Sequence, residues 1–243
     1  MSEPIILFDI PSREPRRCWT PNPWKTRMLL NFKGLEYRTE WLEYPEIRPR
    51  LEPHLPPNPG PNVMPYTIPA VRLPGGEYVM DSQAIAERIE ALHPAPSARL
   101  DSAPLARLCD IMPRLMPAIR PIFYVRVPGR ILGEASQGYW NRTRGELAGM
   151  PVEELAARNP EAECWDRAEE GVKEVTALLK EAGGPFFLGG EASYADFVWG
   201  GFLIFLKRQG QEVYEELLRR SGDGEVHQRF LEALEPWTKR DAE

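Results

Sequence analysis

An apolar run followed closely by a helix start limits the fold of this chain more than any other feature. Residues 5–8 predict a buried strand. Asn22 is a favourable N-cap residue, and Pro23 suits the first helical position, where its missing N–H costs nothing. Gly34 predicts the end of this helix. Thr20 and Asn22 therefore lie beside a helix N-terminus, where free N–H groups and the helix dipole stabilise an anion.

The residues that follow predict a small mixed α/β layer. Residues 37–42 alternate like a second strand, so the chain begins with a β-α-β unit that has a right-handed crossover. Eight prolines between residues 45 and 65 exclude a long helix and leave room for a short one near residues 46–55. Residues 66–73 and 77–80 predict a hairpin.

Two short polar or proline-containing elements flank this hairpin. Pro69 lies at the start of a strand, where it cannot donate to the ladder. A cis bond after Ile68 would accommodate it and turn the Ile68 backbone groups outward. Asp81 and Ser82 are both suited to cap a helix over residues 83–92.

Helical patterns replace strand patterns from residue 105 onward. Residues 105–127 predict one or two helices kinked by prolines, and residues 153–182 predict helical stretches with a break near Asn159-Pro160. Ser193-x-x-Asp196 predicts a capping box before residues 197–206, which are apolar on all sides and therefore predict a buried helix. Two last helices are predicted over the ranges 212–220 and 227–234.

The expected fold class is α/β plus all-α. We expect a β-α-β-loop-β-β-α domain over residues 1–92, a linker over residues 93–104 and an all-helical bundle over residues 105–243.

Composition argues against several classes of function. The net charge is −6 and there is no run of Lys and Arg, so nucleic-acid binding is not expected. The most apolar segment, residues 197–206, is shorter than the roughly 20 residues that cross a bilayer. Cys18, Cys109 and Cys164 form no disulfide or zinc pattern, and the three histidines lack ligand spacing, so no metal site is expected. We expect no secretory signal and a reducing cytoplasmic location.

Four features together resemble the glutathione transferase superfamily, over nearly the whole chain. They are Thr20-Pro-Asn-Pro-Trp-Lys25, Ile68-Pro69, Asp81-Ser82 followed by Ala84-Ile85, and Ser193-x-x-Asp196. The first is similar to the Ser/Thr-Pro-Asn-x-x-Lys form of bacterial Nu-class and fungal Ure2-like members. Residues 19–34 and 36–40 look most like the fungal etherase-like branch.

The resemblance implies a thioredoxin-like first domain and glutathione as co-substrate. It implies that Pro69 is the cis-proline that holds Ile68 against the cysteinyl part of glutathione. Asp81 would meet the α-ammonium of the γ-glutamyl group, and Ser82 with its N–H would hold the neighbouring carboxylate. The resemblance also implies a homodimer, in which the first domain of one subunit contacts the second domain of the other.

Thr20 is the residue that we expect to stabilise the glutathione thiolate, with Asn22 in support. A free thiol has a pKa of about 8.5, so about 3% is ionised at pH 7. A helix N-terminus favours an anion by up to about 2 kcal/mol, or about 1.5 pK units, which raises the thiolate to about half. A hydroxyl donor adds to this effect.

The second substrate is expected to be an electrophilic, mostly apolar molecule in the cleft between the domains. Arg120, Phe123 and Tyr124 are candidates for its wall. Etherase-like relatives suggest aryl ethers, while conjugation in detoxification or secondary metabolism and isomerisation are equally open.

Two alternatives to transferase activity follow from the same residues. The first is a glutathione-binding or regulatory protein that keeps the fold without turnover. The second is a thiol oxidoreductase that uses Cys18, which lies two residues before Thr20 in the same loop and so at the edge of the expected pocket.

Overall fold

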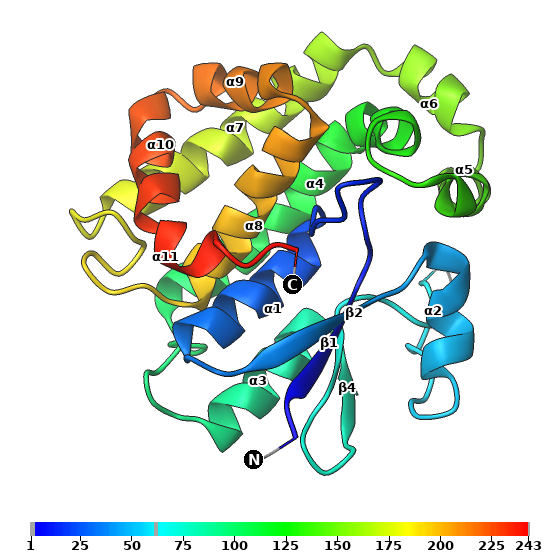
Figure 1. The fold of residues 1–243 in the computed structure, drawn as a ribbon. Coiled ribbons are helices and arrows are strands. Elements are labelled where there is room, and N and C mark those ends of the chain that lie inside the picture. Colours follow the sequence, from blue (N-terminus) through cyan, green and yellow to red (C-terminus); the bar gives the residue numbers. More distant parts are fainter. Residues whose placement is uncertain (1–2, 61–62, 243) are drawn as a thin grey trace.

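In this computed structural model, which describes residues 3–60 and 63–242, four short strands form a mixed sheet near the N-terminus (Figure 1). The strand order is β2-β1-β3-β4. β1 pairs in parallel with β2 and antiparallel with β3, which pairs antiparallel with β4. The strands are β1 (Ile5–Asp9), β2 (Tyr37–Trp41), β3 (Ala70–Arg72) and β4 (Tyr78–Met80). The predicted β-α-β unit is confirmed.

The first helix, α1 (Pro21–Phe32), begins two residues earlier than its sequence pattern suggests. Thr20, with extended backbone, is the N-cap residue, and Pro21 takes the first helical position. The prediction that Asn22 caps the helix and Pro23 begins it is therefore wrong. Pro21 can begin the helix because its fixed φ is already helical and no N–H is needed there. Gly34 ends the helix with a φ of 64°, as predicted.

Helix α2 (Tyr44–Leu51) is the short helix expected in the proline-rich region. Glu43 and Glu46 form a capping box at its start. The proline-rich region also includes residues 61 and 62, which lie outside the described ranges.

The hairpin of β3 and β4 is shorter than predicted. Residues 66–69 lie outside the sheet, because Pro69 has no N–H to donate to a ladder. The Ile68–Pro69 bond is cis, as predicted. Asp81 caps helix α3 (Ser82–Leu92), which begins one residue earlier than expected.

The rest of the chain is helical, which confirms the expected fold class (Figure 1). Helix α4 begins inside the predicted linker, and the sequence pattern made no prediction for α5 or α11. The helices are α4 (Ala103–Arg130), α5 (Glu134–Ala148), α6 (Val152–Arg158), α7 (Glu161–Lys180), α8 (Tyr194–Gln209), α9 (Gln211–Arg220), α10 (Gly224–Ala233) and α11 (Glu235–Thr238).

Helix α4 is one continuous helix of 28 residues although it contains four internal prolines. A proline inside a helix leaves the carbonyl four residues earlier without its N–H partner. Pro128 frees the carbonyl of Tyr124 in this way, and the indole N–H of Trp140 donates to that carbonyl at 2.9 Å. The proline thus provides an attachment point for α5.

Helix α8 is the buried helix predicted from its apolar sequence. Ser193 and Asp196 form the predicted capping box at its start. The helix packs against α1 on one side and contacts α4 and α9 on others (Figure 1). The α/β part and the helical part consequently share one hydrophobic core.

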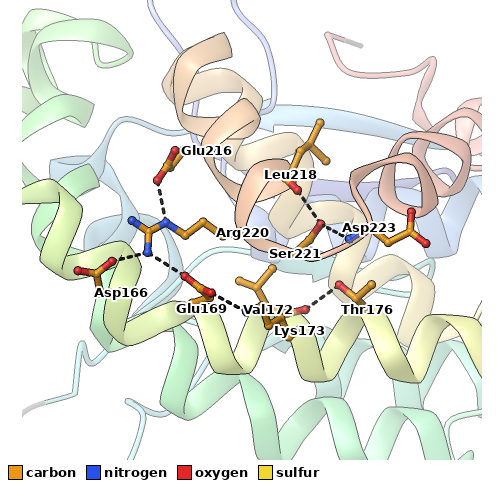
Figure 2. A network of polar contacts seen from close by, with 10 residues as sticks. All are labelled: Asp166, Glu169, Val172, Lys173, Thr176, Glu216, Leu218, Arg220, Ser221 and Asp223. Carbon is orange, nitrogen blue, oxygen red and sulfur yellow. Dashed lines mark hydrogen bonds and ion pairs between the residues drawn. The ribbon is translucent and has the colours of Figure 1, made fainter.

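A charged network joins α9 to α7 at the surface of the helical part (Figure 2). Arg220 of α9 pairs with Asp166 and with Glu169, at 3.0 Å, on α7, and with Glu216, at 2.8 Å, on its own helix. Within the described ranges, every helix is too short or too polar to cross a membrane.

Candidate functional site

Thr20 lies at the junction between β1 and α1, on the wall of a cavity of about 170 Å³. Its side chain is 9% exposed, and its Oγ1 atom has no hydrogen-bond partner in the described part of the chain. As the N-cap residue it would ordinarily bond its own helix, yet its hydroxyl makes no cap bond. A buried hydroxyl without a partner costs about 1–3 kcal/mol, so this atom is suited to a ligand.

Ile68, which precedes the cis-proline, lines the same cavity as Thr20. The carbonyl of Pro69 accepts a hydrogen bond from the N–H of Asp81 at 3.3 Å. This bond connects the cis-proline segment to the start of α3.

Asp81 and Ser82 line a larger cleft of about 770 Å³ between the α/β part and helices α4 and α8. Asn22 lines both this cleft and the smaller cavity, so the two adjoin. Thr20, Asn22 and Ile68 thus line the smaller cavity, and Asn22, Asp81 and Ser82 line the larger cleft. Pro69 lines neither and is connected to the site through its bond to Asp81.

Asp81 has a φ of 82°, which is uncommon for a residue with a side chain. Its Oδ1 atom accepts hydrogen bonds from the N–H groups of Gln83 at 2.9 Å and Ala84 at 3.1 Å. Part of the carboxylate thus caps α3 while the residue stays exposed to the cleft. Strained backbone of this kind is held in place by its surroundings and gathers at ligand sites.

Ser82 is buried, and its carbonyl is held from the helical part of the molecule. The hydroxyl of Tyr194 donates to the Ser82 carbonyl at 2.7 Å. Burial raises the pKa of Tyr194 well above its usual range, so the phenol stays protonated and remains a donor. The capping box at Ser193 therefore places Tyr194 where it fixes the start of α3.

Lys25 also lines the larger cleft. It is the last residue of the Thr20–Lys25 motif, but no role was predicted for it from the sequence. It lies in α1, three residues after Asn22. Burial lowers the pKa of the Lys25 ammonium, and the negative charge of Asp81 opposes this effect. Its spacing from Asn22 was the available signal, because residues three apart share one face of a helix.

The smaller cavity is also lined by Tyr44 of α2 and by Tyr139 and Arg144 of α5, none of which was predicted from the sequence. The rings of Tyr44 and Tyr139 are stacked with their centroids 5.8 Å apart. Because α5 was not predicted, the only available signal was local: Trp140 and Arg144 are four residues apart and so share a helix face.

Cys18 does not line either cavity, contrary to the expectation that it lies at the pocket edge. It is completely buried next to the ion pair between Asp9 and Arg27, whose Oδ2 and Nε atoms are 2.8 Å apart. Burial raises the pKa of the Cys18 thiol well above its usual value, and the charge of Asp9 raises it further. A buried, protonated thiol is unreactive, which argues against a role in thiol exchange.

Of the three residues expected to form a wall on α4, Arg120 alone lines the cleft. Phe123 is buried in the core, where its ring packs edge-on against Phe205 with centroids 5.0 Å apart. Tyr124 packs edge-on against Trp140. Neither Phe123 nor Tyr124 lines the cleft or the smaller cavity, because their rings pack against core residues of α8 and α5.

In the described residues, no group of three or more His, Cys, Asp and Glu side chains lies close enough together to hold a metal ion.

Comparison with known proteins gives matches along most of the chain. Residues 19–92 match the family model for the glutathione S-transferase N-terminal domain, and residues 110–237 match the model for the C-terminal domain. The glutathione S-transferase-like protein ustS of Aspergillus flavus is 29% identical over 240 residues, which cover 91% of this chain and 87% of that protein.

Two solved fungal structures are similar over nearly their whole length. Glutathione S-transferase CsGST63524 of Ceriporiopsis subvermispora, solved in complex with glutathione, is 28% identical with a TM-score of 0.82, covering 97% of this chain and 98% of that one. Glutathione transferase GSTFuA3 of Phanerochaete chrysosporium is 30% identical with a TM-score of 0.78, covering 98% of both chains. With both domain models matched in order along the chain, this protein belongs to the glutathione S-transferase family.

Proposed function

We propose that this protein is a glutathione transferase in which Thr20 stabilises the thiolate of bound glutathione. The observation that carries the proposal is the buried, unpartnered hydroxyl of Thr20 on the wall of a cavity at a helix N-terminus. A thiolate placed there would accept a hydrogen bond from that hydroxyl. Because this bond favours the charged form, it lowers the pKa of the thiol.

The two prolines at the start of α1 leave few backbone donors for a thiolate, so the Thr20 hydroxyl is one of the main donors there. Pro21 and Pro23 have no N–H, and the N–H of Trp24 already donates to the Thr20 carbonyl at 3.4 Å. The first turn therefore offers a thiolate the backbone N–H of Asn22 and the hydroxyl of Thr20. We infer that Asn22 supports Thr20 through its backbone.

The γ-glutamyl end of glutathione would lie in the larger cleft. It carries an ammonium and a carboxylate side by side. Asp81 supplies a carboxylate for the ammonium, while Ser82 at the start of α3 and Lys25 supply donors for the carboxylate. The cysteinyl backbone would pair with Ile68 beside cis-Pro69. Asn22, which lines both cavities, would lie between the two ends of the tripeptide.

The proposed reaction is attack by the thiolate sulfur on an electrophilic carbon of a small molecule. The sulfur lone pair forms the new C–S bond, and the leaving group departs with the electron pair of the bond that breaks. An aryl-ether or halide substrate fits this scheme equally. The proposal includes a cytoplasmic homodimer, as the family resemblance implies, and the molar mass of the protein in solution checks the dimer.

The test is an ultraviolet difference spectrum of glutathione bound to the wild type, Thr20→Ala and Thr20→Ser. We expect a thiolate band in the wild type and in Thr20→Ser. In Thr20→Ala the thiol pKa should rise by about one to two units, since a hydrogen bond to a charged group contributes about 1.5–3 kcal/mol. Glutathione affinity, measured by calorimetry, should change little, because most contacts of the tripeptide lie elsewhere.

A thiolate band that persists unchanged in Thr20→Ala would disprove the role of this residue. Binding without a thiolate band in the wild type would instead favour a glutathione-binding protein without turnover. A Cys18-dependent oxidoreductase is disfavoured by the burial of that thiol.

A further inference from the structure

The wall of the smaller cavity contributed by α2 and α5 has no assigned role in holding glutathione. It contains the rings of Tyr44 and Tyr139 and the guanidinium of Arg144. The Cζ atom of Arg144 lies 4.9 Å from the Tyr44 ring centroid and 4.2 Å from that of Trp140. Stacking on these rings holds the guanidinium at the cavity as a fixed positive charge.

Arg144 retains most of its hydrogen-bonding capacity. Within residues 3–60 and 63–242 it forms no ion pair, and its one hydrogen bond runs from Nη1 to Oγ1 of Thr143 at 2.9 Å. A guanidinium carries five N–H donors in a planar fork that matches a carboxylate. A half-buried arginine with unused donors on a cavity wall can therefore bind an anion.

Tyr44 adds a neutral polar group to this wall. It is buried, and burial raises the pKa of its phenol to about 12, although the nearby charge of Arg144 lowers it in part. The phenol is therefore protonated at neutral pH. Its hydroxyl makes no hydrogen bond to any other described residue, so it too can donate to a ligand.

The size of the cavity limits the part of the electrophile that enters it, beside the glutathione sulfur, to a small group. A cavity of about 150 Å³ holds one benzene molecule, and this one measures about 170 Å³. Aromatic rings line it, and ring–ring contacts favour a flat occupant. A single aromatic ring adjacent to the sulfur, with an anionic group reaching Arg144, matches these features.

We propose that this cavity selects an aromatic electrophile that carries an anionic substituent such as a carboxylate, which Arg144 binds. The inference rests on the proposed function and narrows the second substrate from a mostly apolar molecule to an aromatic acid. Arg144 would contact the anion directly, and Tyr44 and Tyr139 would contact the ring.

The test compares two glutathione derivatives that fill both halves of the site without reacting. S-benzylglutathione and S-(4-carboxybenzyl)glutathione differ only by one carboxylate. Calorimetry on the wild type should show about tenfold tighter binding of the carboxylated compound, because one charge-assisted hydrogen bond accounts for a gain in affinity of this size. In Arg144→Gln the two derivatives should bind equally, while glutathione itself binds as in the wild type. Arg144→Lys, which keeps the charge, should retain part of the preference.

Arg142 provides a matched control on the same helix. Its Cζ atom lies 5.3 Å from the Tyr139 ring centroid, but it is exposed and does not line the cavity. Arg142→Gln should keep the full preference for the carboxylated derivative.

Three results would overturn the proposal, and they are distinguishable. A preference that survives in Arg144→Gln would show that Arg144 does not bind the substituent. Equal weakening of glutathione and both derivatives in Arg144→Gln would show that Arg144 holds the glycyl carboxylate of glutathione instead. Failure of the wild type to bind glutathione or either derivative would refute the proposed function itself.

Discussion

His227 is a fully buried histidine whose two ring nitrogens have different partners. The indole N–H of Trp199 lies 3.1 Å from Nδ1, and Oγ1 of Thr176 lies 2.9 Å from Nε2. An indole nitrogen can only donate, so Nδ1 accepts and Nε2 carries the hydrogen of the neutral ring. Thr176 accepts from Nε2 and donates onward to the Val172 carbonyl. This network requires neutral His227.

His227 should make the protein less stable at acidic pH. Burial lowers the pKa of the His227 imidazole from 6.5 to about 4. Between these values the unfolded chain binds the extra proton and the folded chain does not. The free energy of unfolding therefore falls as the pH drops from about 6.5 to about 4, by about 2 kcal/mol between pH 7 and pH 5.

Comparison with His227→Gln isolates this contribution. The pH dependence of stability that comes from Asp196 has the opposite sign. Burial raises the pKa of its carboxyl from 3.8 to about 6, so its contribution to stability grows as the pH falls across that range. The free energies of unfolding of the wild type and His227→Gln are measured in urea at pH 7 and pH 5. Because both proteins contain Asp196, its effect cancels in the difference between them. The stability advantage of the wild type should shrink at pH 5, and an unchanged advantage would contradict the shifted pKa.

At the scale of elements, the contact between α1 and α8 depends on a glycine. A Cβ atom on Gly201 would lie 2.7 Å from the Pro21 carbonyl oxygen and 3.1 Å from Cβ of Trp24. Real Cβ atoms essentially never come within 3.0 Å of another heavy atom, so either backbone would have to shift. Gly201 thus allows α8 to support the first turn of α1, next to Thr20.

Gly201→Ala should destabilise the protein by about 1–3 kcal/mol, because overpacking forces backbone movement. It should also weaken glutathione binding, since the displaced carbonyl belongs to the residue after Thr20. Thermal unfolding and calorimetry measure the two effects. Gly138→Ala is the control: Gly138 lies within α5 with nothing near its would-be Cβ, so alanine there should be neutral or stabilising by about 0.5–1 kcal/mol. Equal behaviour of the two variants would contradict the packing argument.

Elements with a clear periodic or capping signal were predictable, and α5 was not. Helix α8 is apolar throughout and begins with a capping box, so its sequence alone indicated a buried helix. Helix α5 buries only Ser136, Trp140 and Thr143 and otherwise faces solvent or the site. A helix with so few apolar contacts gives a weak periodic pattern, and the residues it brings to the cavity were missed with it.

At the scale of the whole molecule, Tyr194 connects the helical part to the predicted γ-glutamyl site. Its hydroxyl is the donor to the Ser82 carbonyl, at 2.7 Å. Tyr194→Phe leaves that carbonyl without this partner, so stability should fall by about 1–2 kcal/mol. The KM for glutathione should rise several-fold with little change in kcat, because the thiol end is untouched.

Steady-state kinetics with varied glutathione and thermal unfolding would measure these changes. Tyr214→Phe serves as the comparison, since the Tyr214 hydroxyl on α9 makes no hydrogen bond in the described chain and lies outside the cleft. If Tyr194→Phe bound glutathione as the wild type does, the two parts of the molecule would not be coupled through this contact.

The sequence by itself determined the features that depend on neighbours along the chain. The β-α-β unit, the cis-proline segment, the cap at Asp81 and the capping box at Ser193 all follow from local backbone preferences. These local signals placed Thr20, Ile68, Asp81 and Ser82 on short turns beside strand and helix ends.

Only the tertiary structure decided which side chains face the cleft or the smaller cavity and which are buried. Cys18 and Thr20 are two residues apart, yet packing around the Asp9–Arg27 ion pair buries the thiol while the hydroxyl lines the cavity. Arg144 reaches that cavity because α5 packs against α2. Burial and contacts between distant segments depend on how helices pack, and helix packing is a property of the whole chain rather than of any one segment.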